Sequence, residues 1–137
     1  MPRAIGAAVI TRILIVDDEE PILFALRDYF TNLSCVVHCA QEMEEAEALL
    51  TANEYDVVIA DLRLTGIHGT EGLELVTFVR GRSSARIILL TAYGSAEIER
   101  LAYERGADAF LHKPTPFSYI ASLVGDLLAR QAKGDSR

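Results

Sequence analysis

The sequence predicts an α/β domain in which five parallel strands form one sheet with helices on both faces. Five short apolar runs of strand length alternate with five segments whose apolar residues recur at helical spacing. Strands that alternate with helices in this way are typical of a parallel sheet. The strand runs are apolar at successive positions, which indicates burial on both faces. The 137 residues are enough for one such domain with its own core.

The predicted elements follow one another in regular order. The expected strands are 13–16, 36–39, 57–60, 87–90 and 109–111, and the helical stripes cover 22–33, 44–52, 73–79, 96–105 and 120–128. Pro21 suits the first turn of a helix, Ser95 a helix N-cap, and Gly106 the left-handed position past a helix end. Thr115 and Pro116 are predicted as the N-cap and first residue of the last helix.

The ends of this pattern set the predicted domain boundaries. We expect an N-terminal lead-in over residues 1–10, one domain over 11–131, and a flexible C-terminal tail over 132–137. No apolar run is long enough to span a bilayer. Cys35 and Cys39 share one face of a predicted strand while His38 lies on the other, which favours buried thiols over a metal site. Reduced thiols and the lack of a spanning segment favour a cytoplasmic protein.

The charge of the chain bears on its partners. A net charge of −7 argues against direct binding to nucleic acid, because that binding needs a basic surface that displaces counterions from phosphates. A nucleic acid is therefore not expected as a direct partner. A membrane is not expected either, because no apolar run is long enough to span one.

Polar residues follow four of the five predicted strands at the point where each strand ends. Asp17 and Asp18 follow the first strand, Asp61 the third, Thr91 the fourth and Lys113 the fifth. Ligands of open parallel sheets bind outside the carboxyl ends of the strands. The second strand contributes no such residue, as expected of an edge strand. This favours the strand order 2-1-3-4-5 of a flavodoxin-like, doubly wound (βα)5 fold.

The residue types at these strand ends suggest a chemistry. Carboxylates that converge in one crevice repel each other unless a cation joins them, and their hard oxygens suit Mg²⁺. Asp61 offers a carboxylate nucleophile, Thr91 a hydroxyl, and Lys113 an ammonium group for a phosphoryl oxygen. Each residue alone has an ordinary explanation, as a helix-start charge, a turn residue or a solvated lysine. Their conjunction at one sheet edge favours a site that receives a phosphoryl group.

Four segments in fixed order, ILIVDDEE, VVIADLRL, IILLTAYG and DAFLHKP, carry a resemblance to a known family. The sequence resembles the receiver domains of two-component response regulators, including the single-domain chemotaxis regulator, over about residues 11–131. The resemblance implies that Asp61 is the phosphoacceptor and that Asp18 binds Mg²⁺ (or Mn²⁺) directly. It also implies that Asp17 acts largely through water, and that Asp61 and the backbone carbonyl of Arg63 join the metal shell.

The resemblance also implies a switch. Lys113 would pair with the phosphoryl group, Thr91 would hydrogen-bond it, and Phe110 would be the aromatic side chain that reports the state of the site. The Lys113–Pro114 peptide bond would be cis. Phosphorylation would change the face formed by the fourth helix, fifth strand and fifth helix, through which a homodimer could also form.

The partners implied by the resemblance are proteins. A sensor histidine kinase or a histidine phosphotransfer protein would supply the phosphoryl group, and a downstream effector protein would read the switch. The domain would be a signalling switch and no enzyme, because it catalyses only its own phosphorylation and dephosphorylation.

Other classes remain open from the sequence alone. A degenerate receiver would bind partners without phosphorylation. A phosphatase of the haloacid-dehalogenase type would use a similar set of residues, but its second aspartate lies two residues past the first, whereas Asp17 and Asp18 are adjacent. The chain could also be a piece of a longer regulator, with a linker beginning near residue 130.

Overall fold

The computed structural model describes residues 10–62 and 71–135 of the chain. The described strands are β1 Arg12–Val16, β2 Val36–Ala40, β3 Val57–Ala60, β4 Arg86–Thr91 and β5 Ala109–His112. The described helices are α1 Glu20–Asn32, α2 Met43–Ala52, α3 Glu71–Arg80, α4 Ala96–Arg105 and α5 Phe117–Asp135. The elements alternate as the sequence predicts, and most of their bounds lie within a few residues of the predicted ones.

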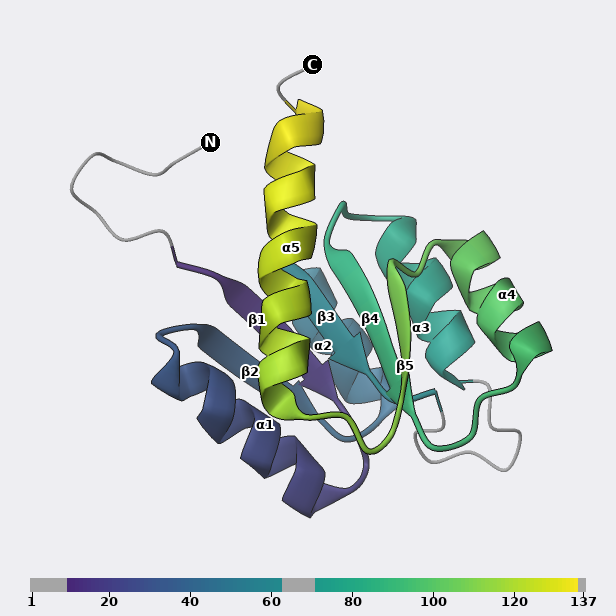
Figure 1. Cartoon of the computed structure of the whole chain (residues 1–137), viewed down its shortest axis with the longest axis horizontal. Helices are drawn as coiled ribbons and strands as arrows, with labels where there is room; N and C mark the ends of the chain where they lie inside the picture. Colours follow the sequence, from purple (N-terminus) through teal and green to yellow (C-terminus); the bar gives the residue numbers. More distant parts are fainter. Residues whose placement is uncertain (1–9, 63–70, 136–137) are drawn as a thin grey trace.

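The five strands form one parallel sheet in the order β2-β1-β3-β4-β5, which confirms the predicted flavodoxin-like topology (Figure 1). The register aligns the strands at their carboxyl ends. Val16 at the end of β1 pairs with Ala40 of β2 on one side and with Ala60 of β3 on the other. Thr91 at the end of β4 pairs with His112 of β5. Residues that directly follow these strands therefore meet along one edge of the sheet.

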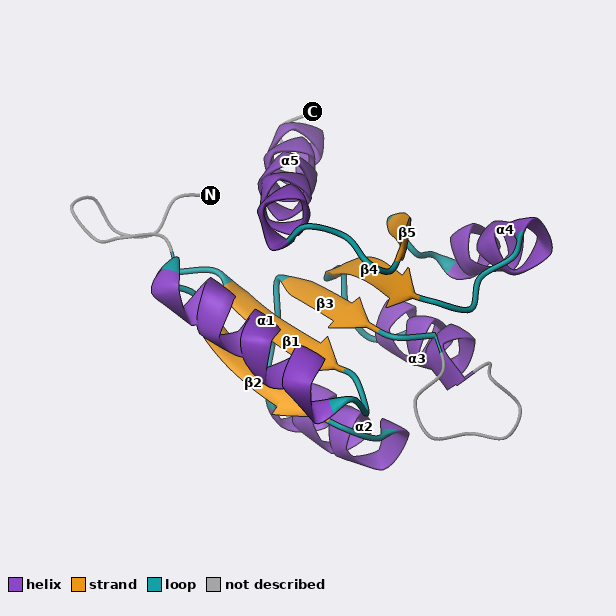
Figure 2. Ribbon diagram, turned by 60° about the horizontal axis from the view of Figure 1, so that its bottom comes forward, coloured by secondary structure: helices purple, strands orange, loops and turns teal. Residues whose placement is uncertain are grey.

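Both faces of the sheet are covered, as Figure 2 shows for α1 and α5 on one side and α2 and α3 on the other. The side chains of β1 alternate between the faces because successive residues of a strand point in opposite directions. Leu14 and Val16 pack with side chains of α2, α3 and α4, whereas Ile13 and Ile15 pack with side chains of α1 and α5. This burial on both faces explains why the central strands are apolar at every position.

Three of the predicted helix-end signals are confirmed. Pro21 lies in the first turn of α1, the side chain of Ser95 accepts a hydrogen bond from the Ile98 amide, and Gly106 adopts a left-handed φ of 118°. Each of these residues acts on the backbone within a few positions of itself, which is why a local pattern could predict it.

The predicted cap of the last helix is wrong. Thr115 does not cap α5, which begins at Phe117. Its hydroxyl instead donates to the His112 carbonyl at 2.6 Å. Pro116 rather than Thr115 therefore directly precedes the first residue of the helix.

A lead-in and a flexible tail were predicted at the two ends of the domain. The predicted lead-in, apart from residue 10, lies outside the described residues. The helix α5 extends to Asp135, so residues 132–135 of the predicted tail continue this helix. Along 10–62 and 71–135, no helix combines the length and the apolar character that crossing a membrane requires.

The edge strand β2 shows the predicted alternation. Cys35, Val37 and Cys39 pack toward the α1 and α5 side, while the ring of His38 lies with its Nδ1 2.6 Å from the Tyr55 hydroxyl. The two thiols are free but only partly buried, which corrects the expectation of buried cysteines. An edge strand has a neighbour on one side only, and this position leaves its side chains partly open to solvent.

Candidate functional site

Backbone hydrogen bonds fix the residues that follow the strands. The Asp17 amide donates to the Ala40 carbonyl at 3.0 Å, and the Asp61 amide donates to the Val16 carbonyl at 2.9 Å. The Lys113 amide donates to the carbonyl of Thr91 at 2.8 Å. These bonds continue the ladders just past the last strand residues. The peptide bond that follows Lys113 is cis, as predicted. The sheet itself therefore positions the backbone of Asp17, Asp61 and Lys113.

The ammonium group of Lys113 joins the carboxylates of this edge. Its Nζ lies 2.8 Å from Asp17 Oδ2, 3.0 Å from Asp61 Oδ2 and 3.2 Å from Glu19 Oε1. The side chains of Asp17 and Asp61 are only 4% and 5% exposed, and that of Lys113 is 12% exposed. The structure thus brings together three residues, Asp17, Asp61 and Lys113, that lie far apart in the sequence and that were predicted to meet.

The charges in this cluster depend on one another. Burial raises the pKa of Asp17 above its ordinary value of 3.8, although the hydrogen bond from Lys113 partly offsets this effect. Burial also disfavours the charged form of Lys113, but the hydrogen bonds to Asp17 and Asp61 outweigh it and raise the pKa of Lys113. The two buried carboxylates therefore keep a cation beside them.

Three carboxylates lie close enough to hold a metal ion. One oxygen each from Asp17, Glu19 and Asp61 falls within 4.8 Å of the others. Carboxylate oxygens are the preferred ligands of hard divalent cations, and buried acids in close proximity gain most from such a charge. The donor set therefore fits a divalent cation, which agrees with the sequence-based expectation of a metal at this edge.

The composition of this carboxylate set differs from the prediction. Asp18 is exposed and is not one of the three, although burial and then the charge of Asp61 raise its pKa. The third carboxylate of the group is that of Glu19, which the sequence analysis did not single out. The acidic run DDEE was a possible signal, but it did not indicate which members point into the crevice. The predicted carbonyl ligand of Arg63 lies outside the described residues.

Thr91 and Phe110 occupy buried positions on the neighbouring strands. Thr91 is fully buried at the end of β4, and its hydroxyl accepts a hydrogen bond from the Tyr93 amide at 3.1 Å. Phe110 of β5 is 6% exposed, and its ring meets the ring of His112 edge to face at 5.5 Å between centroids. Thr91 and Phe110 thus lie on the neighbouring strands β4 and β5, and α4 packs against β5.

The start of α3 abuts the chain directly after β3. The Gly72 amide donates to the Leu62 carbonyl at 2.8 Å. A Cβ atom on Gly72 would lie 2.6 Å from Leu62 Cα and 2.8 Å from the Asp61 carbonyl oxygen. Only glycine permits this approach, and the packing fixes the backbone that carries Asp61.

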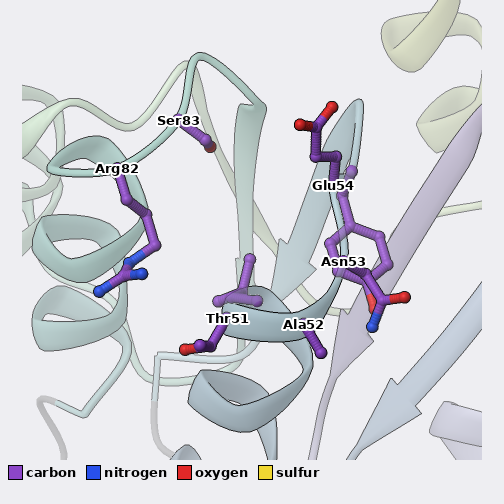
Figure 3. Close-up of a pocket in the computed structure, with 8 residues that line it drawn as sticks. Thr51, Ala52, Asn53, Glu54, Arg82 and Ser83 are labelled. Carbon is purple, nitrogen blue, oxygen red and sulfur yellow. The ribbon is translucent and has the colours of Figure 1, made fainter.

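A cavity of about 340 Å³ lies elsewhere, where the chain leaves α2 and α3 and enters the amino ends of β3 and β4 (Figure 3). Residues 50–55 and Arg82 and Ser83 line it. None of the carboxylates in the cluster contributes to this cavity, which lies at the opposite end of the strands. The acidic cluster around Lys113, and not this cavity, is therefore the candidate site.

The comparisons with known proteins agree with this geometry. The family model for the response regulator receiver domain matches residues 13–124. The chain belongs to the receiver domains of two-component response regulators. It is 32% identical over 123 residues, 90% of its length, to the transcriptional regulatory protein ResD of Bacillus subtilis. It spans about half the length of the curated relatives that it matches.

Two solved structures of related proteins share the fold. A receiver domain protein described as CheY-like, from Methanospirillum hungatei, superposes with a TM-score of 0.84 at 26% identity, covering 92% of this chain and 99% of that one. A response regulator from Burkholderia pseudomallei, which carries a phosphorylated aspartic acid, a calcium ion and citrate, gives a TM-score of 0.75 at 26% identity. That match covers 90% of this chain and 74% of the other. These likenesses confirm the predicted family and fold.

Proposed function

We propose that the domain accepts a phosphoryl group on the carboxylate of Asp61. The observation that carries this proposal is the pair of hydrogen bonds from Lys113 to Asp17 and Asp61, in a crevice at the carboxyl ends of the strands. The ammonium group screens the negative charge that otherwise repels an incoming phosphoryl donor. The carboxylate of Asp61 attacks phosphorus, the bond to the donor breaks, and an aspartyl phosphate results.

A divalent cation, Mg²⁺ or Mn²⁺, completes the proposed site. Bound there, the ion would neutralise charge on the phosphoryl oxygens during transfer. Asp17 and Asp61 would hold it together with Asp18 or Glu19, and the backbone carbonyl of Arg63 would join them. The close approach of carboxylate oxygens from Asp17, Glu19 and Asp61 supports the carboxylate part of this assignment.

The phosphoryl group would be held by two further side chains. Lys113 would release its bond to Asp61 and turn to a phosphoryl oxygen, which the hydroxyl of Thr91 would also contact. The hydrogen bond of 3.0 Å between Lys113 Nζ and Asp61 Oδ2 supports this role, because it already places the ammonium group beside the accepting carboxylate.

The proposed readout is a change in the face formed by α4, β5 and α5. A phosphoryl group adds about two negative charges at Asp61. Thr91 and Phe110, both buried on the adjacent strands, would pass this change to the surface. A sensor histidine kinase or a histidine phosphotransfer protein would be the donor, and a downstream effector or a second copy of the domain would bind this face. The proposed location is the cytoplasm.

Two other functions receive less support. A degenerate receiver would lack part of the phosphoryl-accepting set, whereas this chain retains Asp61, Thr91 and Lys113. A haloacid-dehalogenase-type phosphatase would hydrolyse phosphate esters, and we expect no turnover of p-nitrophenyl phosphate. The domain would act as a signalling switch and not as a conventional enzyme.

The test of the phosphoacceptor is incubation with acetyl phosphate and Mg²⁺, followed by intact-mass measurement. We expect the wild type to gain the mass of one phosphoryl group and the Asp61→Asn variant to gain none. A variant that gains the same mass would overturn the assignment of Asp61. A wild type that stays unmodified with acetyl phosphate, and also binds no beryllofluoride, would contradict the function itself.

A second experiment assigns the third carboxylate of the metal site. The structure favours Glu19, whereas the family resemblance favours Asp18. We expect Asp18→Ala and Glu19→Ala to weaken Mg²⁺ affinity by different factors, and the larger loss identifies the ligand. The matched control is Glu20→Ala, which alters a nearby acid of α1 outside the three-carboxylate cluster. A loss as large in the control as in both other variants would indicate a general electrostatic effect.

A further inference from the structure

The ring of Phe110 lies against a position that has no side chain. A Cβ atom built on Gly94 would lie 2.6 Å from Phe110 Cε1 and 2.7 Å from Phe110 Cζ. The same atom would lie 3.3 Å from Cε1 of His112. Carbon atoms in van der Waals contact are normally about 3.5–4.0 Å apart. The buried position of the Phe110 ring therefore requires that residue 94 be glycine or that the surrounding chain move.

Glycine is needed at this position because a side chain would meet the Phe110 ring, and not because of the backbone conformation. Unlike Gly106, Gly94 is not among the described residues with a positive φ. The atoms that it would meet belong to the tip of an aromatic side chain, which can leave by rotating. A methyl group at residue 94 would therefore act first on the ring of Phe110, or else on the loop between β4 and α4.

This loop is also tied to Thr91. The hydroxyl of Thr91 accepts a hydrogen bond from the amide of Tyr93, the residue directly before Gly94. Thr91 pairs with His112 in the sheet, and the ring of His112 packs on that of Phe110. The residue directly after Gly94 caps α4 with its side chain. Along the described chain, Gly94 thus stands where the Thr91 loop, the Phe110 ring and the start of α4 meet.

We propose that Gly94 is a positioning residue of the switch, whose missing side chain lets Phe110 stay buried and couples the ring to Thr91. The proposal rests on the proposed function, in which Thr91 contacts the phosphoryl group. A displacement of Thr91 would move the backbone at Tyr93 and hence Gly94, which bears directly on the ring. The ring belongs to the same buried cluster as Ala102 of α4, so a change in its position would alter the α4 and β5 surface that a partner contacts.

The experiment compares Gly94→Ala with Gly125→Ala, a control in which the added Cβ meets no atom within 4 Å. The affinity of each variant for beryllofluoride with Mg²⁺ is measured. We expect Gly94→Ala to weaken this affinity by at least about fivefold, the lower end of typical coupling between sites. Gly125→Ala should bind as the wild type does. An affinity in Gly94→Ala that is unchanged or tighter would overturn the proposal.

A rescue variant separates coupling from damage to the fold. In Phe110→Ala the ring is gone, so adding Gly94→Ala should produce no further loss of beryllofluoride affinity. A full further loss in the double variant would show that the methyl group acts without the ring, and would overturn the proposal. If Gly94→Ala alone fails to fold, the double variant should fold; its failure to fold would likewise contradict the role of the ring. Absence of beryllofluoride binding in the wild type would instead contradict the proposed function.

Discussion

Lys113 is the residue on which the charge balance of the crevice depends. Its Nζ hydrogen-bonds Asp17 and Asp61, whose side chains are almost wholly buried. Removing one partner from a buried ion pair leaves the other charges uncompensated, which costs more than the pair itself contributes. A divalent cation placed among the same oxygens would perform the same task. Lys113 and the metal ion would therefore both neutralise the carboxylates at this edge of the sheet.

Replacing Lys113 with methionine tests this reasoning. We expect Lys113→Met to lower the free energy of unfolding by about 3 kcal/mol in the absence of divalent cations, because two buried carboxylates lose their counter-charge. Mg²⁺ should bind the variant more tightly than the wild type and restore part of the loss. Urea denaturation with and without Mg²⁺ measures both effects.

The control for this variant is Arg100→Met, which removes a cation from an exposed pair with Glu104. Because both side chains of that pair are more than half exposed, the expected loss is below about 1 kcal/mol. If Mg²⁺ stabilised Lys113→Met no more than it stabilised the wild type, the shared role of lysine and metal would be wrong.

At the scale of single elements, α4 is a helix whose two ends were predicted from the sequence, and it forms part of the face proposed to bind partners. Ser95 caps its start, and Gly106 closes its end with a left-handed conformation. Only Ala102 of α4 is fully buried, so tertiary packing contributes little to the stability of this helix, and the residues at its two ends contribute a larger share. The predicted cap at Thr115 was wrong because α5 begins two residues further on, at Phe117.

Removing the cap of α4 should have a measurable cost. We expect Ser95→Ala to reduce the free energy of unfolding by about 1 kcal/mol, since the Ile98 amide loses its acceptor. Ser95→Asp keeps an acceptor at the helix start and should retain most of the stability. Urea denaturation of the three proteins provides the measurement. Equal losses in both variants would show that the hydroxyl does not act as a cap.

At the scale of the whole molecule, Asp108 joins segments far apart in the chain. Its carboxylate accepts from Arg80 at the end of α3 at 3.2 Å and from Arg86 of β4 at 3.1 Å. It also accepts from the amide of Ile87 at 2.8 Å. Arg80 further donates to the Gly106 carbonyl past the end of α4. This network ties α3, β4 and the entry to β5 together at the end of the sheet opposite the carboxylate cluster.

Loss of this carboxylate should destabilise the domain as a unit. We expect Asp108→Ala to lower the free energy of unfolding by about 2–4 kcal/mol, because Arg86 and the Ile87 amide lose the acceptor described above and Arg80 loses one of its acceptors. Urea denaturation again provides the measurement. The matched control is Asp28→Ala, which removes an aspartate from an exposed pair with Arg27 and should change little. Similar small effects in both variants would contradict a structural role for Asp108.

Much of the molecule followed from the order of residues along the chain. Helix ends are set by residues that affect only the backbone close to them, such as Pro21, Ser95 and Gly106. Strands are indicated by short apolar runs. The sequence alone therefore predicts where most strands and helices begin and end. The parallel topology then places polar residues at one edge, because each directly follows or ends a strand; they are Asp17, Asp61, Thr91 and Lys113. For this reason the main residues of the candidate site could be predicted, while the family was inferred from the resemblance of the four segments that contain them.

Only the tertiary structure decided the finer contacts of the site, beyond the meeting of Asp17, Asp61 and Lys113. Whether Asp18 or Glu19 joins the carboxylate cluster depends on how the chain turns from β1 into α1, and a run of four acids does not encode that turn. The contact of Gly94 with Phe110 depends on how the loop after β4 lies across β5. The choice among the acids that follow Val16 is therefore a matter of packing geometry, while the presence of an acidic site at that strand end is a property of the sequence itself.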